Sequence, residues 1–148
     1  MIESLILTLS YPLRLMATFL AVGALKVFGV AVSADRTLMM VGDGGMEIAV
    51  TDACSGIEQL GALVLVGVAF AWMMQRSLLL RIVHWMTILP SVVLANAIRL
   101  IATVLLYQGY GDVILGDAWH HGLGYAQSVL ALVLLWLFGL IFQHATQD

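Results

Sequence analysis

The chain has 148 residues, of which 62% are hydrophobic and 10% are charged, and its mean hydropathy is +1.04. These values exclude an ordinary soluble domain, which carries about 25% charged residues because its surface must be polar. The net charge of -3 without a basic run argues against a nucleic-acid partner, and a single cysteine excludes an internal disulfide.

Four apolar stretches are long enough to cross a bilayer, which takes about 20 residues in a helix. They cover residues 13–32, 54–74, 78–107 and 122–142. The third is too long for one straight crossing. We therefore expect its first turns, with Arg81, His84 and Trp85, to lie in the membrane interface. Pro90 is expected to bend the chain into the membrane.

The first stretch has some likeness to a secretory signal peptide, because Val32, Ser33 and Ala34 resemble a small-residue cleavage site. However, the positive charge before the apolar run is Arg14, well inside the chain, and Lys26 interrupts the run. We expect a retained helix, with Lys26 reaching outward along its aliphatic stem.

A β-hairpin is predicted between the first two helices. Residues 36–41 and 46–51 have strand character, and residues 42–45 between them read Gly-Asp-Gly-Gly, a turn signal. We expect the hairpin to lie outside the membrane and to lead directly into the second helix.

Loop charges predict the orientation. The link between the second and third helices carries Arg76 and Arg81 and no acid, whereas residues 33–53 carry four acids and one arginine. Because basic loops stay in the cytoplasm, both termini should be cytoplasmic. The predicted fold is an all-α integral membrane protein over residues 1–148. It is a four-transmembrane-helix bundle with a short outer β-hairpin before the second helix.

Cys54 lies at the predicted start of the second helix. Ser55 and Glu58 form an S-x-x-E capping box, and Asp52 is an alternative cap. In either case the sulfur lies at the positive end of the helix dipole, which lowers the pKa of a thiol. Free backbone N–H groups beside it could bind an oxyanion. The alternative is a small buried cysteine without chemistry.

Asn96 and Arg99 are three residues apart and share a face of the third helix. An arginine at this depth cannot face lipid cheaply, so it must face a partner or a wet cavity. Glu58 is the expected partner by depth. The alternative is a purely structural Glu58–Arg99 ion pair, with Asn96 joining helices by hydrogen bonds.

His120 and His121 open the fourth helix at the outer surface. A histidine there can act as a base near neutral pH, or the pair can hold the helix at headgroup level beside Trp119. No cluster of further ligands supports a metal, so none is expected. A haem would need His84 and His120 at matching depths, which the predicted topology opposes.

A thiol, an arginine and a histidine from three helices are thus predicted at one membrane face. These groups are a nucleophile, an electrostatic stabiliser and a base, the parts needed for acyl transfer. The alternative is a non-catalytic membrane subunit or scaffold, in which the polar residues only hold helices together.

Three blocks carry a resemblance to a known family. Ala53-Cys54-Ser55-Gly56, Asn96-Ala97-Ile98-Arg99 and His120-His121-Gly122-Leu123-Gly124 resemble, in this order, the A-C-S-G, N-x-x-R and H-x-x-x-G blocks of the exosortase/archaeosortase family. The chain resembles the short bacterial members. The resemblance implies a membrane cysteine transpeptidase without a cofactor. It would act on membrane-anchored proteins whose C-terminal sorting signal is a short motif, a membrane helix and a basic tail.

The resemblance also implies roles by position. Cys54 would be the nucleophile, Arg99 would stabilise the oxyanion, and His120 would be the general acid/base, with His121 as the alternative. Residues in supporting positions are Ser55, Glu58 and Asn96. The active site would lie at the outer face of the inner membrane. The substrate helix could arrive laterally along the glycine positions of the second helix, unless these pack internally: Gly56, Gly61 and Gly67.

Overall fold

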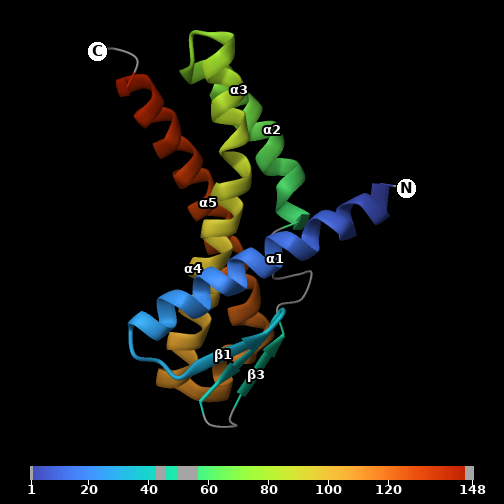
Figure 1. The fold of residues 1–148 in the computed structure, drawn as a ribbon, viewed down its shortest axis with the longest axis vertical. Coiled ribbons are helices and arrows are strands. Elements are labelled where there is room, and N and C mark those ends of the chain that lie inside the picture. The colour runs from blue at the N-terminus through green and yellow to red at the C-terminus, as the bar shows by residue number, and fades with distance from the viewer. Residues whose placement is uncertain (1, 43–45, 50–56, 146–148) are drawn as a thin grey trace.

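The computed structural model describes residues 2–42, 46–49 and 57–145, which form helices with a small sheet at one end (Figure 1). The elements, in chain order, are α1 (Ile2–Val27), β1 (Val32–Asp35), β2 (Leu38–Val41), β3 (Met46–Ala49), α2 (Ile57–Met74), α3 (Leu78–Met86), α4 (Ile88–Tyr110), the 3-10 helix η2 (Gly111–Leu115) and α5 (Asp117–Ala145). The mostly helical class expected from the sequence is confirmed.

Helix α4 lies at the centre and buries two faces. One packs against α1 and the sheet, with buried residues at helical spacing: Val93, Ala97, Leu100 and Val104. The other packs against α2 and α5, again at helical spacing: Ile88, Val92 and Ala95. Arg99 is the next position on this second face, because it follows Ala95 by one helical turn. The packing of α4 therefore places Arg99 on the side of α5.

Helix α1 does not run alongside the other helices but crosses α4 at a steep angle (Figure 1). Ala17 and Ala21 are fully buried at the crossing, and small residues let two helix backbones approach closely. The helix covers residues 2–27, so it begins and ends earlier than the expected 13–32. Its end is a glycine cap: Val30 N–H donates to the Leu25 carbonyl, and Gly29 has a positive φ of 78°.

Within the described ranges, two helical segments are long and apolar enough to cross a membrane: Leu78–Ile114 and Asp117–Ala145. Much of the apolar surface of α5 is exposed, including Val129 and Ile141, which is unfavourable in water and typical of a lipid-facing helix. Helix α2 is a shorter apolar segment by the same measure. The membrane class is supported, and the count of four crossings stays a prediction.

The sheet contains the expected hairpin and one strand more. β2 pairs antiparallel with β3, which confirms the hairpin, and β1 pairs antiparallel with the other edge of β2. β1 was not predicted, because Val32 was assigned to the first helix. Buried side chains anchor the sheet to α1 and α4: Val32, Met39 and Val41.

The long third stretch is interrupted at Thr87, between α3 and α4. Pro90 explains this position, because a proline ring clashes with the carbonyl four residues earlier, here Met86, the last residue of α3. At the interruption, the Thr87 hydroxyl donates a hydrogen bond to the His84 carbonyl at 2.6 Å. The combined 37-residue segment exceeds the hydrocarbon thickness of about 30 Å, so some of its turns must lie outside it.

His84 is fully buried within the protein, and its expected depth at the membrane interface stays a prediction. Its Nε2 lies 3.0 Å from the Leu135 carbonyl oxygen and donates to it. Gly139 makes room for the imidazole, since a Cβ there would lie 2.8 Å from His84 Cε1. Beside it, Gln75 Nε2 donates to the Gly139 carbonyl at 3.0 Å. His84 therefore joins α5 to α3, and Gln75 joins α5 to the α2–α3 turn.

Two glycines of α2 should respond differently to leucine. A Cβ on Gly67 would lie 2.6 Å from Ile88 Cδ1, whereas a Cβ on Gly61 would meet no atom within 4 Å. Gly67→Leu is therefore expected to lower the free energy of unfolding by about 1–3 kcal/mol, and Gly61→Leu to leave it nearly unchanged. Thermal unfolding of both variants in detergent measures this. Equal midpoints would contradict the packing of α2 against Ile88.

Candidate functional site

Arg99 forms the centre of the candidate site. Its side chain is 6% exposed and reaches from α4 to α5. Nη1 donates to Gln127 Oε1 at 3.0 Å, and Nη2 donates to the main-chain oxygen of His120 at 3.4 Å. The site lies toward the end of the molecule that carries the sheet, where α5 begins (Figure 1). Arg99 and the main chain of His120 are thus brought together, whereas the role of the His120 imidazole stays a prediction.

Two acceptors of Arg99, the Gln127 amide oxygen and the His120 main-chain carbonyl, are neutral groups. A guanidinium that is removed from water must be hydrogen-bonded, because an unpaired buried charge costs several kcal/mol. The Gln127 amide oxygen and the His120 main-chain carbonyl help to meet this need. In such a buried place a charge acts more strongly than in water.

Gln127 is the site residue that sequence reasoning missed. It is 3% exposed and lies two helical turns after His120, on the same face of α5. The sequence does indicate that Gln127 needs a partner, since residues 122–142 are otherwise largely apolar and a polar side chain inside such a helix must be hydrogen-bonded. The partner itself, 28 residues earlier in the chain, was not visible in the sequence.

His120 and His121 are both exposed in the first turns of α5, and their ring centroids are 6.1 Å apart. The contact of Arg99 with the His120 main chain fixes this turn against α4. His84, by contrast, contacts Leu135, which lies 15 residues beyond His120, or about 22 Å along α5. His84 and His120 therefore lie beside parts of α5 that are far apart, as the argument against a shared haem required.

Asn96 is 1% exposed and lies one turn before Arg99 on α4. Its side-chain nitrogen and oxygen make no hydrogen bond to any residue in the described ranges. The expected role in joining helices by hydrogen bonds is therefore not seen in the part of the chain that the structure describes.

The other predicted residues belong to the segment that leads into α2. Cys54 and Ser55 lie outside the described residues, and Glu58 is in the first turn of α2, where only its backbone is described. Their predicted roles, and the pairing of Glu58 with Arg99, stay predictions. The structure adds Gln127 and the His120 carbonyl as partners of the arginine.

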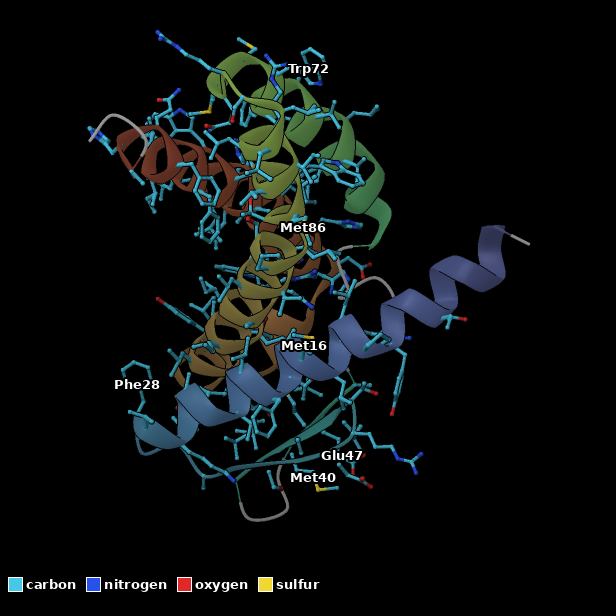
Figure 2. All side chains as sticks on the ribbon, turned by 45° about the horizontal axis from the view of Figure 1, so that its top comes forward. Met16, Phe28, Met40, Glu47, Trp72 and Met86 are labelled. Carbon is cyan, nitrogen blue, oxygen red and sulfur yellow. The ribbon has the colours of Figure 1, made fainter. Side chains whose placement is uncertain are left out.

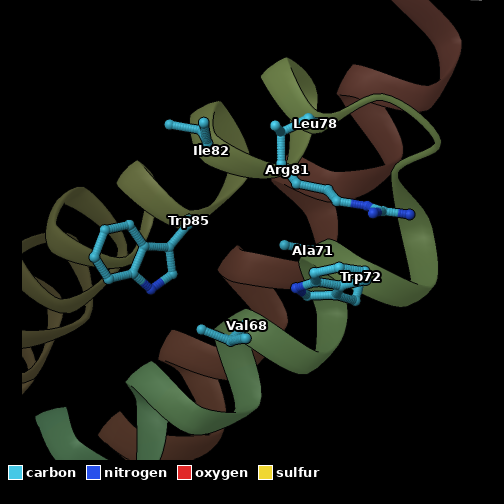
Figure 3. Close-up of a pocket in the computed structure, with 7 residues that line it drawn as sticks. All are labelled: Val68, Ala71, Trp72, Leu78, Arg81, Ile82 and Trp85. Atoms are coloured by element: carbon cyan, nitrogen blue, oxygen red, sulfur yellow. The ribbon is translucent and has the colours of Figure 1, made fainter.

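Two described cavities lie elsewhere, between α2 and the α3–α4 segment. The first, of about 180 Å³, is lined by Val68, Ala71, Trp72, Leu78, Arg81, Ile82 and Trp85 (Figure 3). There the Arg81 guanidinium stacks over the Trp72 ring at 4.1 Å. Trp72 lies at the opposite end of the molecule from Met40 and Glu47 of the sheet (Figure 2).

The second cavity, of about 310 Å³, is lined by Val64, Trp85, Met86, Ile88 and Leu89. Neither lining contains a nucleophile or a general base.

Comparison with known proteins gives one result. A family model described as a transmembrane exosortase matches residues 1–137. No curated protein and no solved structure matches the chain. The matched region includes the three motif blocks and every residue of the candidate site.

Proposed function

Because the chain belongs to the transmembrane exosortase family, we propose that it is a membrane cysteine transpeptidase that cleaves C-terminal sorting signals and transfers the new C-terminus to an acceptor. The observation that carries the proposal is the buried Arg99, held against the first turn of α5 at His120. A charge placed in this way is suited to stabilising an oxyanion. A purely structural scaffold role would require only that the Arg99 guanidinium have hydrogen-bond or ion-pair partners.

In the proposed reaction the Cys54 thiolate attacks a peptide carbonyl carbon of the substrate. The S–C bond forms, and the carbonyl oxygen becomes an oxyanion held by Arg99 and backbone N–H groups. The C–N bond then breaks, and His120 gives its proton to the leaving amine. An acceptor nucleophile next attacks the thioester, loses its proton to His120 and releases the thiolate. His121 is the alternative acid/base.

The register of α2 against α4 supports a meeting of Cys54 with Arg99. The two helices run in opposite directions (Figure 1), and Gly67 faces Ile88. Counting ten residues from this contact along each helix leads to Ile57 on α2 and Ile98 on α4. The chain thus enters α2 at about the depth of Arg99. Cys54 precedes Ile57 by three residues, so their Cα atoms are at most about 11 Å apart.

The distribution of charge supports a site at the outer face of the inner membrane. Arg76 is in the α2–α3 turn and Arg81 is in α3. The sheet and the start of α5, which carries His120, lie at the other end of the molecule (Figure 1). If the basic turn is cytoplasmic, the arginine–histidine site faces outward and the C-terminal end of α5 faces inward.

Lateral delivery of the substrate is proposed because the substrate carries its own membrane helix. The exposed Gly61 on α2 offers an open surface near the proposed site, whereas Gly67 packs internally and is excluded from this role. Gly56 lies outside the described residues. A substrate helix could therefore approach α2 closely at Gly61.

The test uses purified protein in proteoliposomes and two substrates at equal concentration. One is a full sorting signal with its membrane helix and basic tail, and the other is a soluble peptide with only the cleavage motif. We expect at least about a tenfold faster cleavage of the anchored substrate, because confinement to the bilayer raises its effective concentration. Gly61→Leu should slow only the anchored substrate.

Equal cleavage rates would contradict lateral delivery but would be consistent with the proposed transpeptidase function. Cleavage of neither substrate, with protein that is folded, would contradict the proposed function and favour the non-catalytic subunit.

A further inference from the structure

The two hollows beside α2 adjoin each other, because Trp85 lines both of them. Together they form a groove between α2 and the α3–α4 segment, called here the α2 groove. Each side contributes residues at helical spacing: Trp72, Val68 and Val64 from α2, and Arg81, Trp85 and Leu89 from α3 and α4. Eight residues separate Arg81 from Leu89, so the groove extends about 12 Å along the helices. This length is within the hydrocarbon depth of one membrane leaflet, roughly 15 Å.

The two ends of the α2 groove differ in character. At the end beside the α2–α3 turn, the half-buried Arg81 stacks over the Trp72 ring at 4.1 Å, and its Nε donates to the Gln75 carbonyl at 3.0 Å (Figure 3). Trp72 and Trp85 are both exposed, as tryptophans at the level of lipid headgroups are. Toward the other end the lining is apolar: Val64, Met86, Ile88 and Leu89. The groove thus has one cationic end and continues as an apolar channel.

Positive charge dominates the chain around the cationic end. Arg76 is exposed in the adjoining turn. The sequence has no aspartate or glutamate between Glu58, in the first turn of α2, and Asp112, after α4. Helix α5 has none after Asp117 in its first turn. A negatively charged group at this end of the groove would therefore meet two arginines.

An anionic phospholipid matches this arrangement of charge and apolar surface. Its phosphate is a good acceptor for a guanidinium, and its acyl chain suits the apolar channel. A membrane helix of another protein fits less well. One helical turn with its side chains is about 10 Å wide and 5.4 Å long, or about 420 Å³, whereas the hollow beside Arg81 has about 180 Å³. The basic tail of a sorting signal would also be repelled by the two arginines.

We propose that the α2 groove binds one anionic phospholipid, whose phosphate contacts Arg81 and whose acyl chain occupies the hollows between α2 and the α3–α4 segment. Arg76, in the adjoining turn, adds a second positive charge beside the headgroup. The acyl chain fills space that the protein's own side chains leave open, so the bound lipid stabilises the packing of α2 against α3 and α4. The inference does not depend on the proposed transpeptidase function.

Tryptophan fluorescence measures the lipid preference of the groove. Trp119 and Trp136 are replaced by phenylalanine, which leaves Trp72 and Trp85 in the groove as reporters. The full chain is placed in phosphatidylcholine vesicles with a small fraction of lipid whose brominated acyl chains quench tryptophan at close range. The brominated lipid is phosphatidylglycerol in one series and phosphatidylcholine in the other. We expect phosphatidylglycerol to bind roughly five- to twentyfold more tightly, since each arginine near a headgroup favours negative charge about fivefold. Equal quenching by the two lipids would overturn the proposal.

Charge variants test the cationic end. Arg81→Gln should lower the preference for phosphatidylglycerol about fivefold, and adding Arg76→Gln should bring it close to one. Arg81→Lys should retain most of the preference, because an ammonium group also binds phosphate. The matched control is Arg36→Gln, which removes the same charge from an exposed position between β1 and β2, at the other end of the molecule (Figure 1). An unchanged preference in the double variant, or an equal loss in Arg36→Gln, would overturn the proposal.

A second pair of variants tests whether the lipid enters the groove or only lies on the surface. Val68→Phe fills the hollow that Val68 lines, whereas Leu65→Phe adds similar bulk at a position of α2 that is 75% exposed and lines neither hollow. We expect Val68→Phe to bring the preference within about twofold of one, and Leu65→Phe to leave it unchanged, because only the first blocks the acyl chain. A parent-like preference in Val68→Phe would overturn the proposal, since charge alone would then explain it.

Thermal unfolding in detergent supplies a readout without tryptophan quenching and shows that each variant is folded. Added phosphatidylglycerol should raise the unfolding midpoint of the parent protein more than phosphatidylcholine does, and this difference should disappear in the Arg76→Gln, Arg81→Gln double variant. Soluble glycerol phosphate, which has the headgroup charge but no acyl chain, should not relieve the quenching by brominated phosphatidylglycerol. Full relief would identify a site for free phosphate and overturn the proposal, as would equal midpoints with the two lipids.

Discussion

Cys54→Ala is expected to abolish both thioester formation and sorting-signal cleavage, with a loss in rate of roughly 10⁴-fold or more. Without the thiolate, no covalent intermediate can form, and the oxyanion-stabilising groups have no tetrahedral adduct to act on. The measurement is single-turnover mass spectrometry of the protein with an anchored substrate, with hydroxylamine added to release the acyl group. Since Cys54 is the only cysteine, any thioester is assigned to it.

Cys54→Ser is the matched variant, because it keeps the size and polarity of the side chain but replaces the thiol by a much weaker nucleophile. It should fold like the parent protein and also lose cleavage. If either variant cleaves at the parent rate while its thermal unfolding is normal, Cys54 is not the nucleophile, and the non-catalytic alternative becomes the better explanation.

Arg99→Lys is expected to lower the rate of thioester formation by roughly 10²- to 10³-fold, the range found for loss of one oxyanion donor. Lysine keeps the charge, but its single ammonium group cannot reproduce the planar pair of contacts to Gln127 and His120. Rate and thermal unfolding should be measured on the same samples, because a buried arginine also contributes to stability.

Arg81→Lys is the control for this change. Arg81 lies at the other end of the bundle, where it stacks on Trp72 and donates to the Gln75 carbonyl at 3.0 Å. Its replacement should affect stability but leave the rate of thioester formation within about twofold, because Arg81 contacts neither Arg99 nor its partners Gln127 and His120. A rate for Arg99→Lys close to that of the parent would identify Arg99 as a structural residue.

The sequence by itself determined the features that depend on near neighbours. Apolar content identified a membrane protein, and the Gly-Asp-Gly-Gly turn identified the hairpin formed by β2 and β3. Pro90 indicated the interruption between α3 and α4, because its clash reaches only four residues back. The motif blocks gave the family, which the match over residues 1–137 confirms. Each of these signals is carried by a few consecutive residues.

The tertiary structure decided what depends on contacts between distant residues. It paired Arg99 with Gln127, 28 residues away, and buried His84 against Leu135, 51 residues away. It also laid α1 across α4 and added β1 to the sheet. Hydropathy gives the depth of a polar residue but not the direction in which it points. That direction is set by which helix faces pack together, and here the packing of α4 against α5 turns Arg99 toward its partners.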